Sequence, residues 1–109
     1  MTEVEKLYKL ANIQKRCVVY SDSYYYPPFT AEKQIAIIKW LAKNKQGFGL
    51  DYYADLSSGA WECGVKFEWE VYKYTKENEV FEEALVSLIN NLWQDLTEAE
   101  QNEIKEILK

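Results

Sequence analysis

Hydrophobic and polar residues alternate more regularly between positions 48 and 74 than anywhere else in the chain. Successive side chains of a β-strand point to opposite faces, so this alternation predicts an antiparallel hairpin with one apolar and one polar face. The apolar face is formed by Phe48, Leu50, Tyr52, Ala54, Leu56, Trp61, Cys63, Val65, Phe67, Trp69 and Val71. The residues expected to be buried are Trp61, Phe67 and Trp69, and those expected to face away from the core are Glu62, Lys66 and Glu68.

The same pattern restricts which residues of the two strands lie opposite each other. Residues that lie opposite each other share a face. The apolar face has even residue numbers before the turn and odd numbers after it, so the two numbers of every opposed pair must add to an odd total. A four-residue loop, Ser57–Ala60, satisfies this rule and places Asp51 opposite Lys66. A two-residue loop also satisfies it but places Asp51 opposite Gly64, which loses the charge pair. We therefore predict the four-residue loop.

Other segments have the three-to-four-residue period of helices. Three of them follow a threonine suited to cap a helix N-terminus, at Thr2, Thr30 and Thr97. The expected elements are a helix over residues 3–14, a short strand over Cys17–Tyr20, and helices over Ala31–Asn44, about Glu79–Gln94 and after Thr97. The prediction is a single α+β domain, residues 1–109, in which a small antiparallel β-sheet built on the 48–74 hairpin is packed by three to four helices.

The helix over Ala31–Asn44 has a wide apolar arc. Its polar positions form one narrow stripe, and a single sheet face does not cover so much apolar surface. Ile37, Trp40 and Leu41 are left without an obvious partner, and large exposed apolar patches usually mark an interface. We therefore expect a homo-oligomer, most simply a symmetric dimer. In the alternative arrangement the last helix covers this patch with Ile104, Ile107 and Leu108.

The segment Tyr24–Phe29 is one candidate binding surface. Its two prolines stiffen it, because a proline ring fixes φ and restricts the preceding residue. Large aromatic rings on a stiffened loop suit ring stacking or peptide recognition. In the alternative arrangement the rings lie over the core and seal its edge. The candidate binding residues of this segment are Tyr24, Tyr25, Tyr26 and Phe29.

The polar face of the predicted hairpin is mostly acidic and is the other candidate surface. Paired carboxylates can hold Mg²⁺ or Ca²⁺ or act in glycoside hydrolysis. A solvated outer face with Lys66 as internal counter-ion explains the same pattern, so we predict neither a metal site nor catalytic residues. The candidate binding residues of this face are Asp51, Tyr53, Asp55, Glu62, Glu68 and Glu70.

The composition narrows the possible chemistry. The chain of 109 residues has no histidine, which removes the usual general base and the commonest zinc ligand. It also lacks the glycine-rich motifs that hold phosphates. We therefore expect a protein that is not an enzyme and has no cofactor. Cys17 and Cys63 are expected to be reduced, with the Cys63 thiol buried and unreactive.

Charge is distributed unevenly along the chain. Residues 1–50 carry eight Lys or Arg and four acids, whereas residues 51–109 carry five and fourteen, for a net charge of −5. This balance argues against a nucleic-acid partner, because phosphate contacts supply most of such affinity. Either the two halves neutralise each other in the fold, or the acidic half faces a basic protein. The chain opens without a signal peptide and has no apolar run of membrane-spanning length, so we expect a cytoplasmic protein with no membrane partner.

Two groups of short motifs resemble a known family. Pro27–Thr30 leads into a helix, and Phe81–Leu85 and Leu88–Leu92 lie in an apolar helix that follows aromatic strands. Over about residues 24–95 this order resembles the small phage-encoded αβα-sandwich proteins. The resemblance implies a sandwich-like fold, a phage or prophage origin and the cytoplasm of a bacterial host. That family has no assigned catalytic residues, so the resemblance implies no site.

Two hypotheses about function follow. The first is a non-enzymatic phage accessory protein that binds a host protein through an acidic and aromatic surface, as an anti-defence inhibitor would. The alternative is a module that sequesters a small ligand or nucleotide with the tyrosine-rich loop, with Trp40 or Trp61 as further stacking platforms, in a homo-oligomer. Ionic strength separates them, because an acidic protein contact weakens steeply with salt and ring stacking does not.

Overall fold

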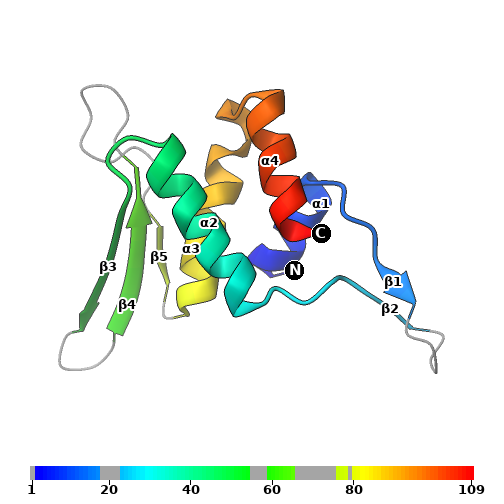
Figure 1. The fold of residues 1–109 in the computed structure, drawn as a ribbon. Helices are drawn as coiled ribbons and strands as arrows, with labels where there is room; N and C mark the ends of the chain where they lie inside the picture. Colours follow the sequence, from blue (N-terminus) through cyan, green and yellow to red (C-terminus); the bar gives the residue numbers. More distant parts are fainter. Residues whose placement is uncertain (1, 18–22, 55–58, 66–75, 79) are drawn as a thin grey trace.

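The computed structural model describes residues 2–17, 23–54, 59–65, 76–78 and 80–109, which form four helices and two antiparallel sheets (Figure 1). The helices are α1 (Glu3–Leu10), α2 (Ala31–Asn44), α3 (Phe81–Leu92) and α4 (Glu98–Leu108), with a 3₁₀ turn, η1 (Trp93–Asp95), after α3. The strands are β1 (Arg16–Cys17), β2 (Tyr24–Tyr25), β3 (Gly49–Ala54), β4 (Gly59–Gly64) and β5 (Lys76–Asn78). The predicted α+β class is confirmed.

The two sheets lie at opposite ends of the molecule, with the helices between them (Figure 1). Strands β3, β4 and β5 make the larger sheet in that order, and β1 pairs with β2 in a separate ribbon. The structure measures 49 × 39 × 22 Å along its principal axes. Within the described ranges, none of the helices is long and apolar enough to cross a membrane. The β1–β2 ribbon projects from the body, and we call it the arm.

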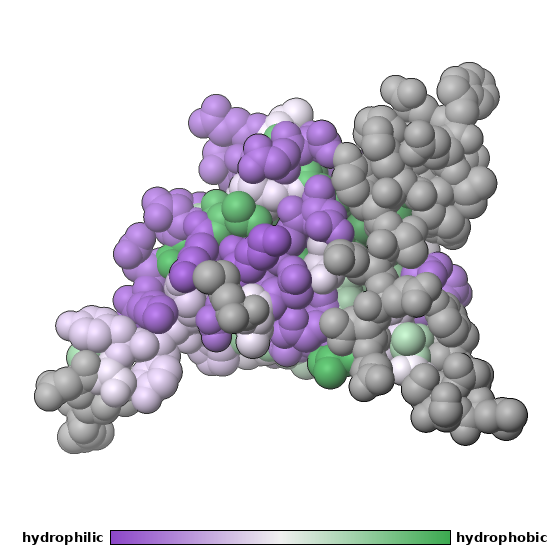
Figure 2. Space-filling model, turned by 180° about the vertical axis from the view of Figure 1, so that it is seen from behind, coloured by the Kyte–Doolittle hydropathy of each residue, from purple (hydrophilic) through white to green (hydrophobic). Residues whose placement is uncertain are grey.

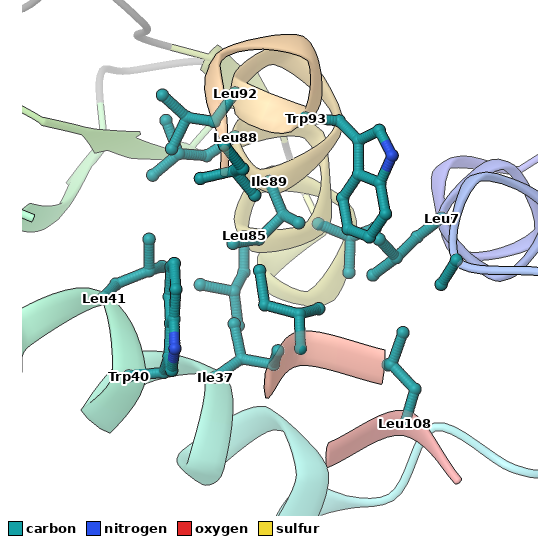
Figure 3. Packing of buried hydrophobic residues seen from close by; sticks show 14 of the residues in the cluster. Leu7, Ile37, Trp40, Leu41, Leu85, Leu88, Ile89, Leu92, Trp93 and Leu108 are labelled. Carbon is teal, nitrogen blue, oxygen red and sulfur yellow. The ribbon is translucent and has the colours of Figure 1, made fainter. Parts of the chain in front are cut away.

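Helix α3 is the centre of the hydrophobic core. It packs against α1, α2 and strands β4 and β5. A helix enclosed on several sides must be apolar around most of its circumference. The buried residues of α3 meet this requirement: Ala84, Leu85, Val86, Ser87, Leu88, Ile89, Asn90 and Leu92. Figure 3 shows its leucines and Ile89 facing side chains of α1 and α2. The helix predicted at about 79–94 is thereby confirmed.

Helix α2 begins and ends as predicted, but the three apolar residues without an obvious partner are covered, while Ile35 on the same helix is exposed. Helix α4 packs on it, and Ile37, Trp40 and Leu41 are all buried within one chain (Figure 3). The indole N–H of Trp40 donates to the Glu103 carboxylate at 2.7 Å, and the Lys33 ammonium donates to the Leu108 carbonyl at 2.9 Å. The argument for a homo-oligomer from this arc is therefore wrong, because the last helix already covers the patch.

Helix α4 is fixed at its N-terminus by the predicted capping box. The Thr97 hydroxyl accepts from the Glu100 N–H at 3.2 Å, and the Glu100 carboxylate accepts from the Thr97 N–H at 3.0 Å. The same carboxylate forms a 2.8 Å ion pair with Lys45, which follows α2. The hydrogen bond from Lys45 is the largest cause that lowers the pKa of Glu100. One side chain thus caps α4 and ties it to the end of α2.

The larger sheet corrects the predicted register. Strand β3 ends at Ala54 and β4 begins at Gly59, so the turn begins two residues earlier than predicted. Asp51 lies opposite Glu62 and not opposite Lys66. Every opposed pair still adds to an odd total, so the rule that keeps one face apolar holds. An exposed ion pair contributes little free energy, and it was a poor guide to the register.

The sequence pattern did not predict β5. This strand is only three polar residues long, and it pairs with β4 so that Glu77 lies opposite Glu62. Cys63 is buried in β4 as predicted, and burial is the main cause that raises its pKa to about 11. Trp61 is only half-buried and not fully buried as predicted, because it packs at the edge of the core, with its ring 4.9 Å from Phe81 in an edge-to-face contact. The predictions for Lys66, Phe67, Glu68 and Trp69 lie outside the described residues.

Candidate binding surface

The end of α1 sets the direction in which the arm leaves the body. The helix stops at Leu10, four residues before the predicted end. Asn12 has a φ of 57°, a left-handed conformation that asparagine tolerates better than most residues. Its N–H donates to the Lys9 carbonyl at 3.1 Å, and the Ile13 N–H donates to the Tyr8 carbonyl at 2.9 Å. This is the Schellman arrangement that satisfies the last carbonyls of a helix, and it turns the chain towards β1.

The arm presents two exposed tyrosines. Arg16 pairs with Tyr25 and Cys17 with Tyr24, so a short antiparallel ribbon holds both tyrosines in extended geometry. Tyr24 is 61% exposed and Tyr25 is 56% exposed. In the view from behind, the arm stands out at the lower left, where pale atoms adjoin strongly hydrophilic ones (Figure 2). The strand predicted at Cys17–Tyr20 begins at Arg16, and its residues 18–20 lie outside the described ranges.

Tyr26 anchors the arm to α1. Its ring stacks on the Tyr8 ring with centroids 5.1 Å apart and planes 12° from parallel. The Lys15 ammonium lies 5.1 Å from the centroid of the Tyr26 ring, within the range of a cation–π interaction. Pro27 is buried next to it, and Phe29 is half-buried against the core. The predicted aromatic cluster therefore divides into two anchoring rings and two exposed ones.

Tyr8 lies beneath this stack with an unsatisfied hydroxyl. It is 1% exposed, and its hydroxyl has no hydrogen-bond partner among the described residues. Burial, and in second place the charge of Glu82, raise the pKa of Tyr8 to about 12. An unpaired buried hydroxyl costs free energy, so the ring must be retained for its packing with Tyr26 and the core.

Three hollows adjoin at the base of the arm. The first, of about 530 Å³, is lined by Lys9, Asn12, Ile13, Gln14, Lys15, Tyr24 and Tyr26. The second, of about 330 Å³, is lined by Thr2, Val4, Glu5, Tyr8, Lys15, Tyr24, Tyr25, Tyr26, Pro27 and Phe29. The third, of about 390 Å³, is lined by Arg16, Cys17, Tyr25, Tyr26, Pro27 and Pro28. Tyr26 borders all three, so the arm and its anchor form one continuous, indented surface.

The acidic face of the sheet is only partly described. Asp51 is exposed, and it lies opposite Glu62, which in turn lies opposite Glu77. Acidic positions thus follow one another across all three strands. Like charges that lie opposite each other across strands repel, so the three acidic positions do not stabilise one another. Of the other predicted residues, Tyr53 lies in β3, and Asp55, Glu68 and Glu70 lie outside the described residues.

Sequence reasoning missed the basic residues at the base of the arm. Lys9, Lys15 and Arg16 are exposed and line the hollows beside the tyrosines. The signal was the Lys15–Arg16 pair directly before the predicted strand at Cys17. No group of three or more His, Cys, Asp or Glu side chains suited to a metal ion occurs among the described residues. Among its described lining residues this surface combines exposed aromatic rings with three cations and one acid, Glu5.

Comparison with known proteins gives no relative for this chain. No family model, curated protein or solved structure matches it. Its function must therefore be argued from the geometry of its own residues.

Proposed function

We propose that this protein is a non-enzymatic protein-binding module that contacts its partner through the arm. The observation that carries the proposal is the exposure of Tyr24 and Tyr25 on a projecting ribbon, at 61% and 56%. The core residues of the helices are buried without them, so the two rings are not needed to complete it. Tyrosine is enriched among the residues that dominate protein–protein binding, because it offers a large contact area with few rotatable bonds.

The arm is favoured over the acidic sheet face for a physical reason. Tyr26 is held by Tyr8 and Lys15, so the neighbouring exposed rings are presented from an ordered anchor, and little conformational freedom is left to lose on binding. The acidic row on the sheet offers charge, and electrostatic complementarity contributes more to association rate and specificity than to affinity. A phage setting remains a prediction that the resemblance implies, and a host protein as partner and an inhibitory role remain predictions of the first hypothesis.

The alternative, a small-ligand or nucleotide site built on aromatic stacking, has less support. Trp40 is 8% exposed and its indole N–H is used by Glu103. Trp61 packs edge-to-face on Phe81, and Tyr26 packs on a tyrosine of α1. Trp40, Trp61 and Tyr26 are therefore already engaged within the chain, and of the expected stacking platforms only Tyr24 and Tyr25 are mostly exposed.

Affinity capture from a lysate of the bacterial host tests the proposal. The immobilised chain is compared with a Tyr24→Ser/Tyr25→Ser variant and with an Asp51→Asn/Glu62→Gln variant, which changes the acidic face by the same number of residues. The protein retained by the wild type should be lost from the tyrosine variant and kept by the sheet variant. With the purified partner, loss of about 2 kcal/mol weakens binding about 30-fold. Loss with the sheet variant alone would assign binding to the acidic face.

A further inference from the structure

The hollow beside Tyr24 continues into a second basic hollow across Asn12, Ile13 and Gln14. The first contains Lys9 and Lys15, and the second, of about 250 Å³, contains Arg16, Lys105 and Lys109 from the end of α4. The described residues that line the two hollows include five cations and no acid. This is unusual in a chain whose net charge is −5. We call this the basic cleft.

The cations of the basic cleft have few ion-pair partners among the described residues. Lys9, Lys15, Arg16 and Lys105 form no ion pair with any described residue, and Lys109 has one exposed pair with Glu106 at 2.8 Å. Lys33 is a further cation near Arg16. Burial is the main cause that lowers the pKa of Lys33, and the positive charge of Arg16 is the second cause. Several like charges gathered with few counter-ions among the described residues repel one another, so an anionic group placed among them is favoured.

We propose that the basic cleft receives the carboxylate side chains of an acidic segment of the partner protein. This inference rests on the proposed function, and it names the chemistry of the partner beside the exposed tyrosines. Carboxylates would lie between Lys15 and Lys105, while an adjoining apolar or aromatic residue of the same segment would pack on Tyr24 or Tyr25. The partner segment would then make an aromatic contact for affinity, and the neighbouring charge contacts would fix the position of the segment on the arm.

A long nucleic acid fits this surface less well than a short acidic segment. A polyanion extends beyond the cleft and meets the acidic half of the chain, where residues 51–109 carry fourteen acids. Such binding draws its affinity from many phosphate contacts along a continuous basic track. The cations here are confined to one end of the molecule, around α1, β1 and the end of α4. The basic cleft is therefore large enough for a few acidic side chains but too short for a nucleic-acid strand.

Titration of the full, isotope-labelled chain with three probes tests the inference by nuclear magnetic resonance. The probes are a short oligo-glutamate peptide, the matched oligo-glutamine peptide and oligothymidylate. Oligo-glutamate should shift the amides of residues 12–16 and 105–109, and oligo-glutamine should not. A Lys15→Gln/Lys105→Gln variant should bind oligo-glutamate at least about fivefold more weakly. A Lys39→Gln/Lys43→Gln variant, which loses the same charge from the exposed side of α2, should bind as the wild type does.

Three outcomes would overturn the inference. They are no binding of oligo-glutamate, equal weakening in both lysine variants, and tighter binding of oligothymidylate than of oligo-glutamate at the same amides. The capture experiment with the Tyr24→Ser/Tyr25→Ser variant is independent of this result. If the tyrosine variant loses the partner and the chain does not respond to oligo-glutamate, the arm remains the proposed binding surface and only the inference of an acidic partner segment is rejected.

Discussion

Replacing Tyr26 by alanine should loosen the arm and lower the free energy of unfolding by about 2–3.5 kcal/mol. The stack on Tyr8 is an aromatic pair, which contributes about 0.5–1.5 kcal/mol beyond the area that it buries. The cation–π contact with Lys15 contributes about 0.5–1 kcal/mol at a partly exposed site. Partial burial of the ring contributes about 1 kcal/mol more, half the value for a fully buried side chain.

Urea unfolding followed by tryptophan fluorescence measures this change, since Trp40 and Trp93 are buried in the core. Tyr26→Phe is the matched control, because it keeps the ring and should stay within about 0.5 kcal/mol of the wild type. Tyr24→Ala should also have an effect below about 0.5 kcal/mol, because that ring is mostly exposed. Equal effects of Tyr24→Ala and Tyr26→Ala would refute the claim that one ring anchors and the other is presented.

Three further predictions concern the core and its titrating groups. The pKa of Tyr8 is raised to about 12 in the folded state, so the free energy of unfolding should fall as the pH rises from 10 towards 12. In Tyr8→Phe the loss of stability between pH 10 and 12 should be smaller, as measured by urea unfolding at each pH. An identical pH profile in the variant would contradict this prediction. A thiol reagent should label exposed Cys17 quickly and buried Cys63 only after denaturation, as followed by mass spectrometry. Rapid labelling of both cysteines in the native protein would contradict the burial of Cys63. Ile104→Ala should lower the free energy of unfolding by about 2–5 kcal/mol, since this residue of α4 is fully buried in the core. Light scattering of a chain ending at Asp95, which lacks α4, should show association through the uncovered α2, and a monomer would contradict that packing.

Helices were the most predictable part of the fold. Thr30 and Thr97 each accept a backbone hydrogen bond in the expected position, because capping depends on residues close in sequence. The apolar period of α3 likewise predicted its burial. The end of α1 was missed because Asn12 acts as a left-handed cap, a role more often taken by glycine.

Contacts between distant segments could not be predicted in the same way. The register of β3 and β4 has several solutions that keep the apolar face inward, and the exposed charge pair did not choose among them. Strand β5 has no apolar pattern of its own and exists through its pairing with β4. The cover of α2 by α4 was recognised only as an alternative to a dimer, because apolar periodicity does not say which partner a face meets.

The candidate surface was predicted in part for the same reason. Tyr24 to Tyr26 were identified from their composition, but which rings anchor and which are presented depends on the stack with Tyr8 from a different element. The basic cleft combines α1, β1 and α4, which are far apart in sequence. Only the fold brings Lys15 and Lys105 to one surface.

Hydrogen–deuterium exchange of the chain alone and bound to its captured partner tests the central claim most directly. If the arm is the contact surface, exchange should slow in residues 13–17 and 23–29 and remain unchanged in β3 and β4. Slowing confined to β3 and β4, with the arm unaffected, would contradict the account and assign binding to the acidic face of the sheet.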